Sequence, residues 1–345
     1  MAGWSFINKI TEQIRKPRLG EEKAPTLWPS EASAIIENQY GEEVNIGKCR
    51  RSIFFRYLIS SYKYYEKYAP YSALVEEIKT KEVPPDKYTY FIWAQGNLYE
   101  DYLLENSKMA GVYVADQTQV YIPSHNVSGK IDIVVQDEDG LYRIVEAKSI
   151  YGFNATKILG TPSERKSGIM GVPKPSYLMQ LGLYQWWYAN GKENFGDALL
   201  VCGARDTGKY GEFGITVEPN QETEEDHIYY YQNDPYPGDK VDSKISIQNI
   251  LRQYEYVQQC LDSGIIPDRD FDLFYSDEKI DTLYERNELT KSEIQRYEKR
   301  KEQLEQNKTK INKQIEKGDW QCSYCSYKDV CYNKQSEPRE IKLRG

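Results

Sequence analysis

The chain has 345 residues, which is enough for one large domain or two ordinary ones with a sizeable core. Its formal net charge of -8 excludes a global positive field, so any contact with nucleic acid or anionic lipid needs a local basic patch. The first 18 residues lack the apolar core of a signal peptide, and no window approaches the roughly 18 apolar residues of a membrane span. We therefore expect a cytoplasmic protein of a bacterial, archaeal or phage-infected cell, without membrane contact.

Helical patterns come first along the chain. Residues 28–68 repeat apolar side chains at spacings of three and four, which predicts two helices, with Ser30 as the N-cap of the first and Cys49 at the start of the second. Residues 91–109 show the same periodicity. We expect a third helix there, and it carries Glu100.

The period then changes to two, which is typical of strands. Four β-branched runs follow this pattern: 112–114, 119–122, 131–135 and 142–147. The last two flank the acidic turn sequence from Asp137 to Gly140, which predicts a hairpin. Because Asp132 and Glu146 are equally distant from residue 139, they would lie across from one another in that hairpin.

The second half of the chain is more irregular. Residues 152–176 are rich in Gly and Pro and hold four basic residues against one acidic residue, which predicts a long basic loop. We expect a helix over 177–188, a strand over 198–202 and an amphipathic helix over 245–261. The highly charged residues 277–317 favour a helical hairpin or a short coiled coil.

Three carboxylates, Glu100, Asp132 and Glu146, are candidates to share one divalent cation, and Lys148 lies on the same strand face as Glu146. A solvated face with an ordinary salt bridge would also explain Glu146 and Lys148. It accounts less well for Asp132, which is embedded in an apolar run. Hard oxygen ligands suit Mg²⁺ or Mn²⁺, which would polarise a phosphodiester and acidify a bound water that Lys148 orients.

Two short motifs resemble those of the PD-(D/E)XK nuclease superfamily: Gly129-Lys130-Ile131-Asp132 its second motif, and Glu146-Ala147-Lys148 its ExK motif. Gln180-Leu181-Gly182-Leu183-Tyr184 resembles the QxxxY motif of the RecB-like branch, although an isolated example is more often the polar edge of a buried helix. The resemblance implies a restriction-endonuclease-like α/β core with a mixed central sheet flanked by helices.

The same resemblance implies roles for individual residues. Asp132, Glu146 and Lys148 would be catalytic, Gln180 and Tyr184 would contact DNA, and Glu100 would join the two acids as a metal ligand. The reaction would be metal-dependent DNA cleavage, and we expect an exonuclease that acts on single strands or DNA ends. Glu100 departs from the family, because its position is usually occupied by His.

Cysteines form a second constellation near the end of the chain. Cys322, Cys325 and Cys331 make a Cys-x2-Cys-x5-Cys array, and three thiolates imply a fourth ligand. The candidates for it are Cys49, Cys202 and Cys260, of which the last two are more simply explained as small buried residues. One close pair with two single cysteines favours an iron-sulfur cluster, with zinc as the alternative.

The array resembles that of the four-cysteine RecB-like nucleases, which include CRISPR-associated exonucleases and the nuclease domain of AddB. This resemblance implies that Cys49, Cys322, Cys325 and Cys331 bind a [4Fe-4S] cluster. A structural rather than a redox role is expected, because the cluster would close a long loop.

These observations predict four regions: an amino-terminal extension (1–27), a nuclease core (28–266), a charged helical insertion (267–319) and a cysteine module with a basic tail (320–345). Residues 277–317 could dock a recombination, repair or CRISPR-adaptation protein.

A rival hypothesis for the function of the whole chain is a non-catalytic DNA-binding or assembly subunit that retains the nuclease fold and cluster.

Two further features are set aside. The segment from Gly203 to Tyr210 nearly matches a phosphate-binding loop, but Tyr210 replaces the required Ser or Thr and a strand pattern follows, so we predict a hairpin turn. His125 and His227 lie in polar contexts and are predicted to be ordinary surface residues, not general bases.

Overall fold

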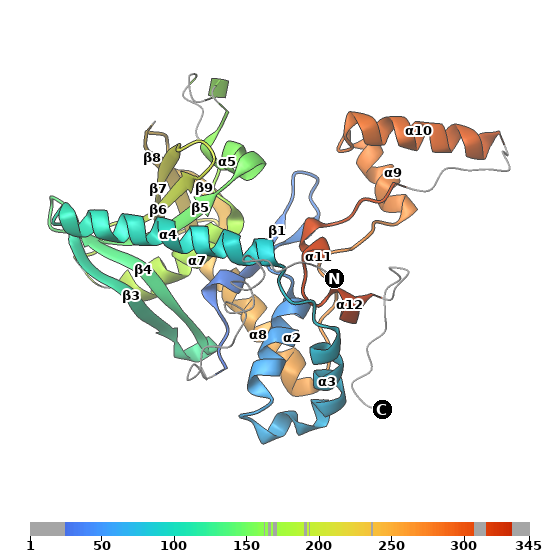
Figure 1. Ribbon diagram of the computed structural model, residues 1–345, viewed down its shortest axis with the longest axis horizontal. Coiled ribbons are helices and arrows are strands. Elements are labelled where there is room, and N and C mark those ends of the chain that lie inside the picture. Colours follow the sequence, from blue (N-terminus) through green and yellow to red (C-terminus); the bar gives the residue numbers. More distant parts are fainter. Residues whose placement is uncertain are drawn as a thin grey trace, which may run out of the picture.

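A computed structural model describes residues 25–161, 163–164, 167, 171–189, 192, 194–235, 237–306 and 315–332 (Figure 1). Most of the predicted amino-terminal extension, Arg165 and Lys166 of the basic loop, residues 307–314 of the charged insertion and the basic tail beyond residue 332 lie outside this range. Within the described part, no helix is both long and apolar enough to cross a membrane.

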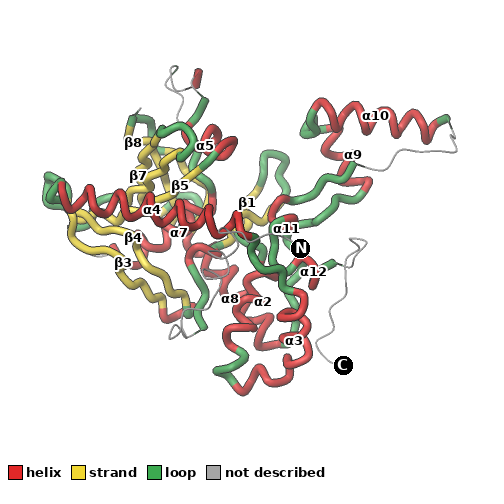
Figure 2. Tube along the Cα trace, in the orientation of Figure 1, coloured by secondary structure: helices red, strands yellow, loops and turns green. Residues whose placement is uncertain are grey.

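A seven-stranded mixed sheet forms the centre of the molecule, coloured yellow in Figure 2. All neighbouring strands are antiparallel except β5 and β6, which are parallel and are joined through a helical crossover. The mixed sheet with flanking helices confirms the predicted fold class. In spatial order the strands are β3 (Tyr113–Ile122), β4 (Val127–Gln136), β5 (Tyr142–Ile150), β6 (Ala198–Ala204), β7 (Tyr210–Pro219), β8 (Asp226–Asp234) and β9 (Val241–Ser246).

Helices cover both faces of this sheet. The long helix α4 (Lys87–Met109) places the Tyr99 ring against Gly203, where a β-carbon would come within 2.5 Å of the ring. Helix α7 (Pro175–Tyr184) instead contacts the face of Glu146, which pairs with Leu200 in the register of β5 and β6. Because residues 200 and 203 point to opposite faces of β6, α4 and α7 lie on opposite sides of the sheet.

Helix α5 lies against the sheet at β6, and the other remaining helices form a layer beside the sheet and a projecting arm (Figure 1). Helix α8 contacts both α2 and the β8–β9 edge of the sheet. The bounds are α2 (Arg50–Ser61), α3 (Ser72–Lys81), α5 (Gly152–Leu159), α8 (Ile247–Ser263), α9 (Asp277–Glu285), α10 (Lys291–Glu305), α11 (Trp320–Ser323) and α12 (Lys328–Cys331), with short η helices at Pro29–Glu31, Glu66–Tyr71, Pro123–His125 and Gln185–Ala189.

Two local predictions are wrong. Part of the predicted first helix is a hairpin of β1 (Ser33–Glu37) and β2 (Glu43–Gly47), whose turn is held because Asn38 Oδ1 accepts hydrogen bonds from the backbone of Tyr40 and Glu42. Such Asx turns compete with helix formation. The predicted basic loop begins with the helix α5, so its first eight residues are ordered.

Other predictions are confirmed. Cys49 is the N-cap of α2, the hairpin of β4 and β5 closes at the acidic turn, and the segment that resembles a phosphate-binding loop is the turn between β6 and β7. Residues 277–317 contain the expected pair of helices, α9 and α10, which we call the charged arm.

The charged arm has an apolar cluster of its own, separate from the main core. Its buried members are Ile280, Leu283, Leu289, Tyr297 and Ile315. At the base of the arm Asp319 accepts hydrogen bonds from the Asp272 backbone (2.8 Å) and the Tyr275 hydroxyl (2.7 Å), which ties the two ends of the arm together. The arm meets the β1–β2 turn through Arg286 and Glu42 (2.9 Å).

We therefore expect the main body to fold without the arm. Replacing residues 277–316 with a short Gly/Ser linker should lower the free energy of unfolding by less than about 2 kcal/mol, because the lost contacts to the body are exposed ion pairs and hydrogen bonds. Urea unfolding followed by circular dichroism measures this. Loss of the cooperative transition would show instead that the arm belongs to the core.

Candidate functional site

The hairpin of β4 and β5 positions the two central carboxylates. Ile133 pairs with Val145, so the next positions along the same register are Asp132 and Glu146, as the sequence predicts. The backbone N–H of Ala147 donates to Asp132 Oδ2 (2.9 Å). This bond fixes the Asp132 side chain across the strand boundary and beside Glu146.

Glu146 is the most buried acid of the site, with 1% of its surface exposed. Its Oε1 accepts hydrogen bonds from Lys148 Nζ and from Gln180 Nε2, the latter at 2.7 Å. Its Oε2 is buried and has no hydrogen-bond partner among the described residues. Burial raises the pKa of Glu146 to about 7, an effect that Asp132 reinforces and Lys148 opposes.

Asp132 and Glu100 show the same effect. Burial is the main cause that raises the pKa of each, and the negative charge of Asp132 adds to the shift of Glu100. Glu100 lies on α4, where its Oε1 accepts a hydrogen bond from Gln117 Nε2 (2.7 Å). Three acids that are each costly to ionise, and that repel one another, form what we call the carboxylate cluster.

Lys148 provides a positive charge next to this cluster. Burial by itself would lower its pKa, but Glu146 and Asp132 outweigh that effect and the pKa is raised overall. Lys148 Nζ also lies 5.5 Å from the centre of the Tyr177 ring. Lys148 is therefore held as a cation, suited to bind negative charge rather than to accept a proton.

Helix α7 contacts the carboxylate cluster through Gln180, which donates a hydrogen bond to Glu146. Gln180 and Tyr184 are one helical turn apart, and the Gln180 amide that donates to Glu146 is 3.5 Å from the Tyr184 hydroxyl. Tyr184 is 2% exposed. A β-carbon at Gly129 would come within 2.6 Å of the Tyr184 hydroxyl, which explains why the strand carries glycine there.

The cluster has the donors that a hard cation needs, although they are not gathered around one point. Across the described ranges, no group of three or more His, Cys, Asp or Glu side chains is arranged to hold a metal ion. The donors are nevertheless all carboxylate oxygens, and the unpartnered Glu146 Oε2 is an acceptor without a donor. This donor set fits Mg²⁺ or Mn²⁺, which retain several waters in protein sites.

The predicted cysteine ligands come from distant parts of the chain and line one pocket, although among the described residues their side chains are not arranged around one point as a metal site. Cys49 at the start of α2 lines one pocket with Cys322, Cys325 and Cys331, and we call this the cysteine pocket. Cys202 and Cys260 are buried on β6 and α8 and do not line it. The carboxy-terminal helices α11 and α12 thus face the amino-terminal end of α2.

The pocket disfavours ionisation of Cys49, Cys322 and Cys331. Burial raises the pKa of Cys49 to about 11 and that of Cys322 to about 12, and the neighbouring Cys49 adds to the shift of Cys322. All four are free thiols. Because a metal binds the thiolate, a cation would have to displace these protons, as is usual for cysteine sites.

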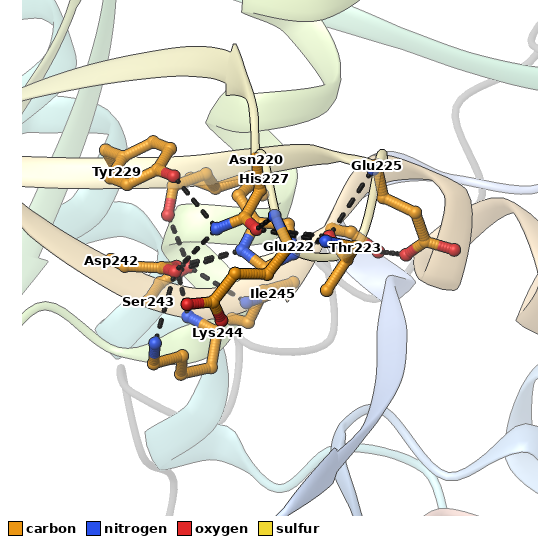
Figure 3. A network of polar contacts seen from close by, with 12 residues as sticks. Asn220, Glu222, Thr223, Glu225, His227, Tyr229, Asp242, Ser243, Lys244 and Ile245 are labelled. Atoms are coloured by element: carbon orange, nitrogen blue, oxygen red, sulfur yellow. Dashed lines mark hydrogen bonds and ion pairs between the residues drawn. The ribbon is translucent and has the colours of Figure 1, made fainter.

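His227 corrects the prediction that it is an ordinary surface residue, because it is buried within a polar network (Figure 3). Its Nε2 is 3.0 Å from Thr223 Oγ1 and its Nδ1 is 3.0 Å from Asp242 Oδ2, an order that resembles a hydrolytic triad. The backbone N–H groups of residues 222–225 are all bonded within the turn, so they cannot stabilise an oxyanion. We interpret the network as structural.

Sequence reasoning also missed Gln117, the partner of Glu100. Gln117 has a positive φ of 45° at an irregular point of β3, and no local pattern indicates that its amide reaches α4. His125, by contrast, lies in a short surface turn and pairs with Glu255 (2.9 Å).

Comparison with known proteins gives one match. The family model described as PD-(D/E)XK nuclease superfamily matches residues 74–332, which include the carboxylate cluster, Lys148, Gln180 and three of the four pocket cysteines. No curated protein and no solved structure matches the chain.

The contact between Gly129 and Tyr184 is open to a direct test. Gly129→Ala should destabilise the protein by about 1–3 kcal/mol, because the new methyl group would overlap the Tyr184 hydroxyl and the Pro29 ring. Combining it with Tyr184→Phe should recover part of the loss. Urea unfolding curves provide the measurement.

Gly96→Ala is the matched control, because no atom lies within 4 Å of the added carbon and the position is in the middle of α4. It should stabilise the protein by about 0.5–1 kcal/mol. Equal effects of the two substitutions would contradict the packing argument.

Proposed function

This chain belongs to the PD-(D/E)XK nuclease superfamily, and from that premise we propose that it is a metal-dependent deoxyribonuclease of the RecB-like branch, an exonuclease that acts on single strands or DNA ends. The observation that carries the proposal is the Glu146 carboxylate. One of its oxygens is held by Lys148 and Gln180, and the other is buried and unpartnered beside Asp132. A purely structural ion pair has no need to leave that oxygen open.

Asp132, Glu146 and Glu100 are the residues that would hold Mg²⁺ or Mn²⁺, as nucleases of this superfamily generally use divalent metals. When bound, the metal supplies Lewis-acid activation of the phosphate and of a water. Gln180 keeps the Glu146 carboxylate in one orientation. Lys148 would supply fixed positive charge next to the phosphate as it gains negative charge in the pentacoordinate transition state. Electrostatic stabilisation of this kind is among the largest contributions to catalysis.

Exposed rings next to the site support a single-stranded substrate. Tyr151 follows β5 three residues after Lys148, Phe153 lies in α5, and the two are 59% and 82% exposed. The Arg205 guanidinium lies 5.3 Å from the Tyr151 ring. Aromatic rings beside a cation can stack unpaired bases and neutralise their phosphates, which a chain with a net charge of -8 must do locally.

The cysteine pocket would hold a [4Fe-4S] cluster, with zinc as the alternative. Four thiols from two distant segments converge on it, and a group bound there would join residue 49 to the carboxy-terminal module. Closing so long a loop stabilises the folded chain by about 5 kcal/mol in the loop-entropy account. The cluster's role would be to hold these segments together.

Substitution of the carboxylate cluster tests the proposal. Asp132→Asn, Glu146→Gln and Lys148→Met should each lower kcat by roughly 10³-fold or more on end-labelled single strands with Mn²⁺. DNA affinity should be unchanged or tighter for the first two, since each removes a negative charge that repels phosphate.

Glu105→Gln is the matched control on α4, because Glu105 is exposed and pairs only with Lys108 in this structure. It should retain full activity. If Glu146→Gln remained fully active, the site would be misplaced. If the wild-type chain bound DNA tightly but cleaved no DNA with either metal, it would be the non-catalytic subunit.

The pKa of Glu146 predicts how metal binding depends on pH. Because that pKa is raised to about 7, a proton occupies the carboxylate below pH 7 and must leave when a cation binds. The affinity for Mn²⁺ should therefore fall close to tenfold per pH unit below about pH 7 and level off above it. Calorimetric titration across this range measures the slope, and an affinity independent of pH would contradict the assignment of Glu146 as a ligand.

A further inference from the structure

The cysteine pocket has an unusual charge environment. Besides its four thiols, half of its described lining residues carry rings, and no Asp or Glu is among them, although Asp270 and Asp319 act electrostatically on Cys49 and Cys322. Two cations, Arg269 and Lys328, line it as well. The rings are Phe55, Phe271, Tyr327 and Tyr332. A low-dielectric wall of this kind strengthens every electrostatic interaction inside the pocket.

Arg269 brings an unused donor to this wall. Its Nε is buried and has no hydrogen-bond partner among the residues that the structure describes. The guanidinium lies 5.3 Å from the Tyr332 ring, and its charge acts on both Cys331 and Asp272. A buried guanidinium N–H without an acceptor destabilises the fold, so its position calls for an acceptor.

Arg51 brings a second cation to the same thiols. It is 9% exposed, its Nε donates to the Pro267 carbonyl (2.6 Å), and its positive charge favours the thiolate form of Cys331. The adjacent Arg50 is different, because its guanidinium is engaged by Asp270 (2.8 Å) and Gln253 (3.2 Å). Both arginines act electrostatically on a pocket cysteine, Arg51 on Cys331 and Arg50 on Cys49, but the Arg50 charge is also paired with the Asp270 carboxylate.

We infer that Arg51 and Arg269 are positioning residues that neutralise an anionic thiolate-ligated metal group in the cysteine pocket, with Arg51 placing a buried positive charge near Cys331 and Arg269 donating its free Nε–H to the bound group. The inference rests on the proposed cluster. Four thiolates around a [4Fe-4S]²⁺ core carry a net charge of about -2, which two arginines balance. Without neighbouring cations, a cluster with this negative charge would be costly to bury in an apolar pocket.

The two arginines have a redox consequence. Reduction adds one more negative charge to the cluster, and a nearby cation or a hydrogen bond to sulfur stabilises the reduced form. Removing either arginine should therefore move the reduction potential to more negative values. It should also loosen the thiolate ligands and expose the cluster to oxygen.

The test uses the full-length chain, reconstituted anaerobically with iron and sulfide. The variants are Arg269→Gln, Arg51→Gln and the charge-retaining Arg269→Lys, with Arg50→Lys as the matched control. Iron content, a potentiometric titration and the rate at which visible absorbance is lost in air are measured for each. Circular dichroism of each protein establishes that it folds.

We expect Arg269→Gln to be reduced at a more negative potential and to bleach at least threefold faster than the wild type. Arg269→Lys should fall between the two, and Arg50→Lys should match the wild type. An unchanged potential and bleaching rate in Arg269→Gln and Arg51→Gln would overturn the inference. If either Gln variant fails to fold, the comparison of Arg269→Lys with Arg50→Lys decides, because equal behaviour of those two overturns it.

Failure of the proposed cluster is a separate outcome. If the wild type binds zinc instead of iron, the cluster is wrong, and the rate of zinc release to a chelator then tests the arginines. Release at least threefold faster from Arg269→Gln supports them, and equal release overturns them. If the wild type binds neither metal, both the cluster and the inference fall.

Discussion

The site depends on one energetically unfavourable feature, the burial of the Glu146 carboxylate in the central sheet, which removes its charge from water. A buried carboxylate must be paired, hydrogen-bonded or protonated. Lys148 and Gln180 satisfy one oxygen, which requires α7 to lie on that face and Gly129 to leave room for Tyr184. The motif residues are therefore one packing unit, and their spacing in the sequence follows from it.

The parts of the fold set by local chemistry could be predicted from the sequence. The acidic turn fixed the register of β4 and β5, and through it the position of Asp132 beside Glu146. The β1–β2 hairpin could not be predicted, because five residues with two adjacent isoleucines fit a helical period as well as a strand period. The deciding contact, the Asn38 turn, involves only the side chain of one residue.

Contacts between distant segments were predictable only where a family resemblance supplied them. Cys49 was placed with the carboxy-terminal triplet in this way, and all four line one pocket. Gln117 and Arg269 belong to no motif in the sequence, and their contacts depend on where α4 and the segment after α8 come to lie. Long-range polar contacts of this kind leave no periodic signal in a sequence.

Glu100 on α4 interacts electrostatically with the two carboxylates on β4 and β5. A histidine there would be neutral without a metal, whereas a glutamate adds a third acid and raises the cost of ionising the others; it already contributes to the raised pKa of Glu146. Gln117 holds one Glu100 oxygen and leaves the charge uncompensated. In the proposed metal site glutamate would be a harder ligand than histidine, and it makes the metal-free cluster less stable as an anion. An oxygen-binding divalent cation relieves all three acids together, which is why the departure from the family pattern is compatible with a metal site.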